Sequence, residues 1–384
     1  MAKLLFITTR NVYKYGGSMR LIKNRSKALN EDYGIETELI CYISEKKVKE
    51  RKEEAYFASE KIISYKRNPT DMFSKYRQFE EEIIQALKKE EYSAVVLSGS
   101  FPSNIARKIK KNFNIYVVYD SHGVWDKIKE FNKNPFNRIK YLVFKQRERF
   151  LLKFTDGALV VTDSLRKYLK KRYKWDKDSF IVPPAADSRE YSFEEAKELR
   201  EQWRAKLGIA DDEVLFIYSG RISLQQSIAD AHETFKNYIK EGGKAKFLIM
   251  TPDIKKINYD DTIVMSFSPE LVSEVLFAGD IAMLLRDNVV TSKVDFPNKY
   301  LEYVKSNMFI ISTPYISEVS KEIIDTATGM IIKNNSSFVG HLLMTKFSKE
   351  KPLWEDFENR KKLIEKHSFK NTLVPFAEKI KSLK

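Results

Sequence analysis

The sequence predicts an α/β fold made of two Rossmann-like domains. Short apolar runs, typical of buried parallel strands, alternate with stretches in which apolar residues recur at helical spacing. The segments 4–18 (LLFITTRNVYKYGGS) and 214–227 (VLFIYSGRISLQQS) are two similar openings, each an apolar strand that runs into a polar turn. We therefore expect two doubly wound halves.

The expected strands are apolar runs bounded by turn residues. In the first half they lie at residues 3–9, 36–43, 61–65, 93–100, 115–120, 155–161 and 178–182, and in the second at 213–220, 244–253, 261–266, 281–285 and 308–312. The helix after the first strand carries Met19, Ile22 and Leu29 on one face, and Gly34 suits its C-cap. The double proline at Pro183-Pro184 and the charged helix after it mark a domain boundary.

Composition excludes several classes of protein. With 43% hydrophobic and 13% aromatic residues, the 384-residue chain can bury two cores and is not disordered. A single cysteine, Cys41, and four histidines without ligand spacing predict neither a disulfide framework nor a metal site. The first apolar run, LLFI, is too short for a signal peptide, and no run reaches the roughly 18 apolar residues of a membrane span. We expect a cytoplasmic protein.

The net charge of +15 has several explanations. Nucleic acid, an anionic membrane and a phosphate-rich substrate all attract cations, and a lysine-rich solvated surface needs no partner. No zinc finger, RNP pair or KH loop is present, so we expect no nucleic-acid partner. Charge alone does not choose among the others.

The most informative stretch is 280–314 (DIAMLLRDNVVTSKVDFPNKYLEYVKSNMFIISTP). Its order of apolar strand, polar loop, short helix and apolar strand predicts a parallel βαβ unit. Pro297 suits the first turn of the helix. The backbone amides of Asn298 and Lys299 would then face the loop and form an anion site, which the Lys299 side chain reinforces.

The pattern S-x-V-x-F-P-x-K-x-x-E-Y at residues 292–303 resembles the donor-sugar loop of GT-B-fold nucleotide-sugar glycosyltransferases, nearest to the retaining family-four type. The resemblance implies that Glu302 binds the ribose of a nucleotide. It implies a donor site in the C-terminal domain, an acceptor site in the N-terminal domain, and a reaction in the cleft between them. It also implies domains at 1–187 and 188–365, with a C-terminal helix at 366–384 that returns to the first domain.

Two further segments match family motifs. Gly16-Gly17 resembles the Gly-Gly loop near the transferred sugar, although a plain flexible turn is the alternative. Gly220-Arg221 resembles the start of G-R-x-x-x-x-K-G, whose Arg and Lys bind the diphosphate; a surface salt bridge is the alternative for Arg221. Gln226 stands where the family has Lys, and Lys299 is expected to supply the second cation.

The sequence departs from the family at other points. The acidic residue eight positions before Glu302 is replaced by Val294, and Asp295 is the nearest carboxylate. Either Asp295 contacts the donor sugar through a changed loop, or sugar handling differs, or activity is reduced. The family would pair the nucleobase with backbone near Ser266. The segment 178–187 resembles its strand-plus-PNGxD segment, with Asp187 at the Asp.

His122 directly follows the strand at 115–120 and precedes Gly123. A histidine at the carboxyl end of a parallel strand can donate or accept a proton near neutral pH, so His122 is a candidate for the reaction centre. A loop hydrogen bond without a catalytic role is the alternative.

The segment 127–157 interleaves basic and apolar residues. It can be an amphipathic helix on an anionic lipid surface, or a helix that packs on the sheet and solvates its basic face; the two interpretations are compatible.

We therefore expect a glycosyltransferase that moves a sugar from a UDP- or GDP-sugar to a cell-surface glycan or lipid-linked acceptor, with retention, without metal or resident cofactor, and with peripheral contact to the inner face of the membrane. His122, Arg221 and Lys299 are the expected catalytic residues. The alternatives are a non-catalytic GT-B subunit, a nucleotide-sugar epimerase and, on charge alone, a nucleic-acid-binding protein.

Overall fold

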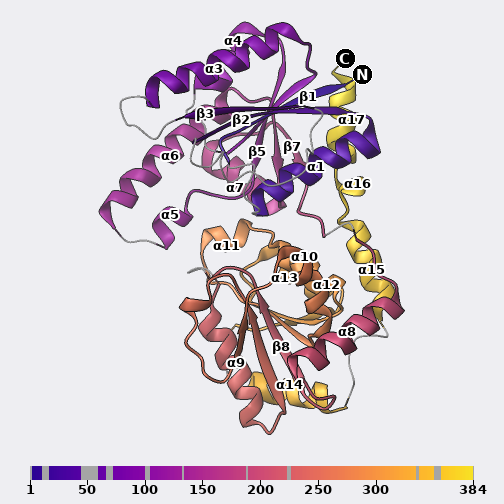
Figure 1. Ribbon diagram of the computed structural model, residues 1–384. Coiled ribbons are helices and arrows are strands. Elements are labelled where there is room, and N and C mark those ends of the chain that lie inside the picture. The colour runs from indigo at the N-terminus through magenta and orange to yellow at the C-terminus, as the bar shows by residue number, and fades with distance from the viewer. Residues whose placement is uncertain are drawn as a thin grey trace. The chain divides into compact units, whose positions relative to one another are not determined.

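The chain forms two compact units, each with its own parallel sheet (Figure 1). The computed structural model describes residues 2–10, 17–44, 59–65, 72–99, 104–131, 134–186, 189–222, 226–333, 337–349 and 356–383. Unit 1 comprises Met1–Pro184 and Ser368–Lys384, and unit 2 comprises Ala185–His367. The division follows Pro184 rather than residue 187, and the last segment joins unit 1 at Ser368 rather than at residue 366. The α/β fold with two Rossmann-like domains is confirmed.

Unit 1 contains a seven-stranded sheet in the order β3-β2-β1-β4-β5-β6-β7, with every neighbouring pair parallel. Its strands are β1 (Lys3–Thr8), β2 (Glu36–Ser44), β3 (Ser59–Tyr65), β4 (Ala94–Ser98), β5 (Tyr116–Ser121), β6 (Gly157–Val160) and β7 (Asp178–Ile181). The strand order changes direction between β1 and β4. In open α/β sheets the carboxyl ends at such a point are the usual place for a ligand.

Several helices of unit 1 have a cap residue of the expected type. The helices of this unit are α1 (Gly17–Tyr33), α3 (Met72–Lys89), α4 (Asn104–Asn112), α5 (Lys127–Glu130), α6 (Pro135–Lys153), α7 (Asp163–Tyr173), α16 (Phe369–Thr372) and α17 (Val374–Ser382). Gly34 ends α1 with a φ of 62°, as expected. The Thr162 side chain accepts the backbone N–H of Leu165 and caps α7. In α17, Phe376 packs edge-on against Phe180 of β7, so the C-terminal segment completes unit 1.

Unit 2 contains a six-stranded parallel sheet in the order β10-β9-β8-β11-β12-β13. Its strands are β8 (Val214–Ser219), β9 (Ala245–Met250), β10 (Ile263–Met265), β11 (Ile281–Leu284), β12 (Phe309–Ser312) and β13 (Gly329–Ile331). Its α-helices are α8 (Phe193–Leu207), α9 (Ile228–Lys240), α10 (Pro269–Val275), α11 (Val290–Val294), α12 (Asn298–Lys305), α13 (Ser317–Asp325), α14 (Ser337–Lys349) and α15 (Phe357–Lys366). Here the order changes direction between β8 and β11.

Two local expectations in unit 2 need correction. The segment expected to be a polar loop before Pro297 contains the helical turn α11, and Pro297 is the N-cap of α12 rather than a residue of its first turn. Gly329 begins β13 beside β12. A Cβ on Gly329 would lie 1.9 Å from the carbonyl oxygen of Ile310, so close strand pairing explains the glycine.

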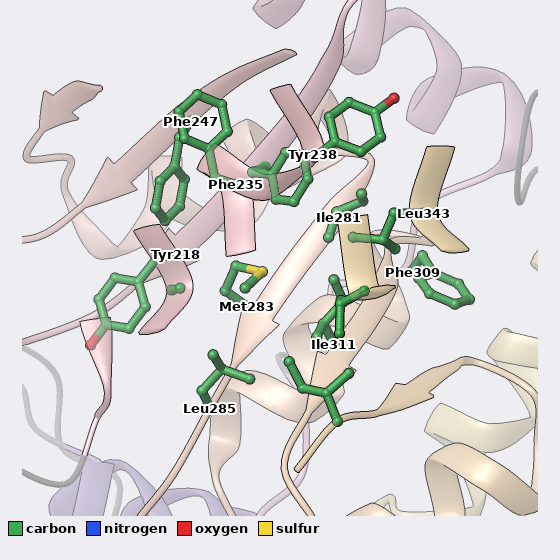
Figure 2. Close-up of a cluster of buried hydrophobic side chains, with 14 of the residues drawn as sticks. Tyr218, Phe235, Tyr238, Phe247, Ile281, Met283, Leu285, Phe309, Ile311 and Leu343 are labelled. Atoms are coloured by element: carbon green, nitrogen blue, oxygen red, sulfur yellow. The ribbon is translucent and has the colours of Figure 1, made fainter. Parts of the chain in front are cut away.

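The core of unit 2 lies on one face of its sheet (Figure 2). Ile281 and Met283 alternate along β11, and Leu285 continues the same face, as the period of two requires. Phe235 of α9 and Leu343 of α14 cover this face. The packing fixes the register of β11 and so the residues that emerge beyond its carboxyl end.

Among the described residues, no helix has the length and apolar character needed to cross a membrane.

Candidate active site

The carboxyl ends of β8 and β11 are adjacent in unit 2, at the point where the strand order changes direction. Gly220 and Arg221 follow β8, and Arg286 follows β11 by two residues. Helix α12 carries Lys299 and Glu302 and leads into β12, the next strand of the sheet. The topology therefore gathers most of the predicted donor-site residues around the carboxyl ends of the strands. We call this side of the unit 2 sheet, where the strands end, its C-terminal edge, or simply the edge.

Lys299 lies against the end of β8. Its Nζ donates a hydrogen bond of 2.7 Å to Oε1 of Gln226 and lies 4.1 Å from the centroid of the Tyr218 ring. A Cβ on Gly220 would be 2.4 Å from Cε of Lys299 and 2.6 Å from its Nζ, and Gly220 has a φ of +121°. The glycine is thus needed both for its backbone conformation and for the passage of the Lys299 side chain.

Gln226 carries no charge itself, but its side chain holds the Lys299 amino group by a hydrogen bond. Its Oε1 accepts hydrogen bonds from Lys299 and from the hydroxyl of Tyr218. The structure therefore brings Lys299 to the residue that stands in place of the family's lysine. The placement agrees with the expectation that Lys299 supplies the second cation, but the role itself stays a prediction.

Arg286 is a cation of this edge that we did not predict. It is buried, its backbone N–H donates to Oγ1 of Thr313 at 3.1 Å, and its carbonyl oxygen accepts from the same hydroxyl at 2.9 Å. None of the described residues accepts a hydrogen bond from its Nε. An arginine directly after a buried parallel strand was a sequence signal of the same kind as the one that pointed to His122.

The electrostatics of the edge favour a bound anion. Burial, together with the nearby positive charge of Arg286, lowers the pKa of Lys299 well below its usual range, although Glu302 and Asp295 oppose the shift. A negatively charged group beside these cations would relieve their repulsion. The edge is therefore suited to an anionic ligand.

The other predicted donor-site residues occupy neighbouring positions. Asn298 is the first residue of α12, where backbone N–H groups lack intrahelical acceptors. Asp295 is the C-cap of α11 and is half-buried, as is Glu302. Arg221 is exposed, and its carbonyl oxygen accepts from the hydroxyl of Tyr218 at 2.9 Å.

Ser266 lies farther along the same edge. It is exposed and follows β10, which β9 separates from β8. The structure thus orders the predicted contacts along the sheet, with the nucleobase position outermost and the diphosphate position at the change of strand direction.

In unit 1, His122 belongs to a buried polar cluster at the carboxyl end of β5. Its Nε2 lies 2.7 Å from Oδ2 of Asp120, whose other oxygen accepts from Arg25 of α1 at 2.7 Å. Because a carboxylate only accepts, Nε2 of a neutral His122 carries the proton and Nδ1 is an acceptor. Nδ1 is buried and has no hydrogen-bond partner among the described residues.

The charges of this cluster are strongly coupled. Although burial opposes ionisation, His122 and Arg25 hold the pKa of Asp120 well below its usual range. Burial lowers the pKa of His122, with Asp120 opposing and the nearby cations Arg10 and Arg25 adding to the effect, which favours the neutral imidazole. Arg10 and Asp120 were not singled out from the sequence, although both flank the ends of predicted strands.

The structure gives little or no information about three of the predicted positions. Gly17 is the first residue of α1, whereas Gly16 and Asp187 lie outside the described residues.

The described residues offer no metal site. Within this part of the chain, no group of three or more His, Cys, Asp and Glu residues could hold a metal ion. The expected independence of metal remains a prediction.

Residues 15–190 match the family model described as Glycosyltransferase Family 4. No curated protein matches the sequence significantly. Among solved structures, WaaG, "a glycosyltransferase involved in lipopolysaccharide biosynthesis", is similar at 16% identity and a TM-score of 0.67, covering 98% of this chain and 99% of its own.

Two other solved structures have the same architecture. A glycosyltransferase from Rickettsia africae is 14% identical with a TM-score of 0.68, and a sucrose-phosphate synthase from Thermosynechococcus elongatus is 12% identical with a TM-score of 0.68. Each comparison covers 100% of this chain and 98% of the other. The family match over residues 15–190 and the GT-B fold of the whole chain confirm the expected resemblance, and the protein is a glycosyltransferase.

Proposed function

We propose that this glycosyltransferase, which resembles the retaining GT-B enzymes of the family-four type, takes its sugar from a nucleoside-diphosphate donor bound at the edge formed by β8, β11 and α12. The observation that carries the proposal is the convergence of Lys299 and Arg286 at this edge, with Arg221 in the adjacent loop. Cations on rigid elements suit a diphosphate, whose charge increases as the bond to the sugar breaks.

In this proposal the protein supplies positive charge where the leaving diphosphate develops negative charge. Lys299 is held by Gln226, and the backbone of Arg286 is held by Thr313, so little reorganisation is needed when the donor binds. The diphosphate would raise the pKa of Lys299 back toward its usual range, because it offsets both desolvation and repulsion by Arg286. Arg221 would bind the same phosphates from the exposed side.

The remaining proposed donor contacts follow the order in which the residues lie along the carboxyl ends of the strands. Glu302 would accept from the ribose hydroxyls, the N–H groups at the start of α12 near Asn298 would face a phosphate, and backbone near Ser266 would meet the base. Asp295 is the carboxylate nearest in sequence to Val294, the position at which the family has the acidic residue that contacts the donor sugar. The donor would be a UDP- or GDP-sugar.

In unit 1 we propose that His122 contacts the transferred sugar or the acceptor. Asp120 fixes the ring and its tautomer, which leaves Nδ1 to accept a hydrogen bond from a sugar hydroxyl. Gly16 and Gly17 keep the role that the family resemblance implies. Retention at the anomeric carbon and independence of metal rest on that resemblance alone.

The proposed acceptor is a cell-surface glycan or its lipid-linked precursor, reached at the inner face of the cell membrane. The support is the excess of positive charge, +15, together with WaaG, a similar structure whose name places it in lipopolysaccharide biosynthesis.

A thermal-shift screen of UDP, GDP, CMP and their common sugar conjugates, without added metal, tests the donor site. We expect one nucleotide series to raise the melting temperature by several degrees at saturation. Glu302→Ala should abolish the shift, whereas Glu201→Ala, a change of an exposed glutamate on α8, should preserve it. Arg221→Ala should lower turnover of the donor that the screen identifies.

Gln226 and Val294 favour a second candidate, a non-catalytic GT-B subunit, because the family has Lys and an acidic residue at these positions. No shift with any nucleotide would favour that candidate. Conversion of the donor without any acceptor would instead indicate the epimerase.

A further inference from the structure

Helix α6 exposes an apolar stripe to solvent. The exposed fractions are 78% for Phe136, 61% for Ile139, 57% for Leu142 and 43% for Val143. At 100° per residue these side chains share one side of the helix. Exposed hydrophobic residues are common singly, but four within eight positions of one helix form a contiguous patch.

The opposite side of α6 is buried, and both polar and apolar side chains lie on it. Nζ of Lys145 lies 3.3 Å from Oδ2 of Asp126, and Glu148 accepts from the hydroxyl of Tyr119 at 2.8 Å and from that of Tyr173. Leu151 and Leu152 are buried on the same side of the helix. These contacts confirm that one face of the helix covers the sheet, and they fix its rotation. The apolar stripe therefore cannot turn inward without breaking a buried network.

Cations border the stripe on both sides. Arg147 and Lys140 lie next to the Phe136 side, and on the other side are Arg138, Arg149 and Lys153; all five are exposed. The only acidic residue of α6 is Glu148, which is buried. The outward face of the helix thus presents apolar and positively charged side chains without a carboxylate.

The neighbouring helices continue the positive charge. Both α4 and α5 pack against α6. Arg107 and Lys111 of α4 are exposed, as are Lys127 and Lys129 of α5. Figure 1 shows α4, α5 and α6 in unit 1, and α6 is the longest of these three helices.

We propose that this face, defined as Phe136, Arg138, Ile139, Lys140, Leu142, Val143, Arg147, Arg149 and Lys153, docks unit 1 on an anionic phospholipid surface. An interfacial helix inserts its apolar stripe at the level of the acyl chains and keeps flanking cations among the headgroups. A nucleic acid offers phosphates but no comparable apolar layer for the four side chains. A second copy would bring two positively charged faces together.

The inference deepens the proposed function, because it names the surface by which the enzyme would reach a lipid-linked acceptor. Vesicle binding needs neither donor nor acceptor. Failure of the nucleotide screen and failure of membrane docking are therefore distinguishable.

The test is flotation of the full-length protein with vesicles of phosphatidylcholine alone or with about 30% phosphatidylglycerol. We expect binding to the anionic vesicles that weakens as salt rises, and little binding to the neutral ones. The double variant Phe136→Ser, Ile139→Ser and the variant Arg147→Glu should each bind the anionic vesicles at least about tenfold more weakly.

Matched controls change the same residue types elsewhere. Ile324→Ser removes a side chain of α13 that is 64% exposed, and Lys255→Glu changes an exposed cation of unit 2; neither should alter vesicle binding. The proposal is overturned if anionic vesicles do not bind at low salt, or if the α6 variants bind as the controls do. A dimer that Phe136→Ser dissociates, without vesicle binding, would show that a second copy covers the face.

Discussion

A methyl group at position 220 would test directly how side chains pack at the proposed donor site, where β8 ends. In Gly220→Ala the new Cβ would lie 2.4 Å from Cε of Lys299, a distance that real Cβ contacts essentially never reach. The lysine must therefore move by about 1 Å to regain ordinary contact. That shift would disturb the 2.7 Å hydrogen bond from Lys299 to Gln226.

Two separate costs follow. Alanine at the φ of +121° that Gly220 adopts costs roughly 1–3 kcal/mol in backbone strain. Displacement of the Lys299 ammonium from its acceptor costs about 1.5–3 kcal/mol, the worth of a hydrogen bond that involves a charged group. The second cost exists only while residue 299 is lysine.

A double-mutant cycle with Lys299→Ala separates the two costs. Calorimetry would give the melting temperature of unit 2 for the four proteins, and for a unit of this size 1 kcal/mol corresponds to about 2–4 °C. We expect Gly220→Ala to destabilise the Lys299→Ala background by about 2 kcal/mol less than the wild type. Equal destabilisation in both backgrounds would refute the contact between Gly220 and Lys299.

Three further substitutions probe other parts of the structure. Arg286→Met should weaken nucleotide binding by about tenfold or more in isothermal titration because a cation leaves the donor edge; unchanged affinity would remove Arg286 from the site. Asp120→Asn should lower the melting temperature of unit 1 by an amount equivalent to about 3–5 kcal/mol, since it leaves the buried Arg25 without its carboxylate. The control Asp176→Asn, in an exposed pair, should change it little, and equal effects would contradict this reasoning. Burial raises the pKa of Glu148 from 4.5 to about 7, so the folded protein holds a proton that the unfolded chain releases. The free energy of unfolding of unit 1 should therefore fall by about 3 kcal/mol as pH rises from about 4.5 to about 7, and the Glu148→Gln variant should lose this dependence in calorimetry across that range. An unchanged pH profile in the variant would assign the titration to another group.

The order of strands and helices could be predicted from the sequence because it depends on local patterns. Apolar runs of strand length, glycine at Gly34 and proline at Pro183 act within a few residues of themselves, and each agrees with the structure. The βαβ unit at 280–314 was predictable for the same reason. The short helix α11 was missed because its turn contains polar and β-branched residues without helical periodicity.

In unit 2, the candidate site was predictable only where residues lie inside a motif. Glu302 and Lys299 share one segment with Pro297, and Gly220-Arg221 follows a recognisable strand. Arg286 was missed because its relevance depends on the adjacency of β8 and β11, which are far apart in the sequence. The contact between Lys299 and Gln226 was likewise invisible, since 73 positions separate them.

By itself, the sequence determined the α/β class and the two-domain organisation, since hydrophobic periodicity carries that information locally, and the kind of enzyme followed from the resemblance of its short motifs to a known family. Only the tertiary structure decided which cations meet at the carboxyl ends of β8 and β11 and which face of α6 stays exposed. Helical periodicity marks both a buried and an exposed stripe on α6, and the buried partners of Lys145 and Glu148, which come from other elements, select between them. Side-chain contacts across the sheet are set by folding as a whole, and no local pattern encodes them.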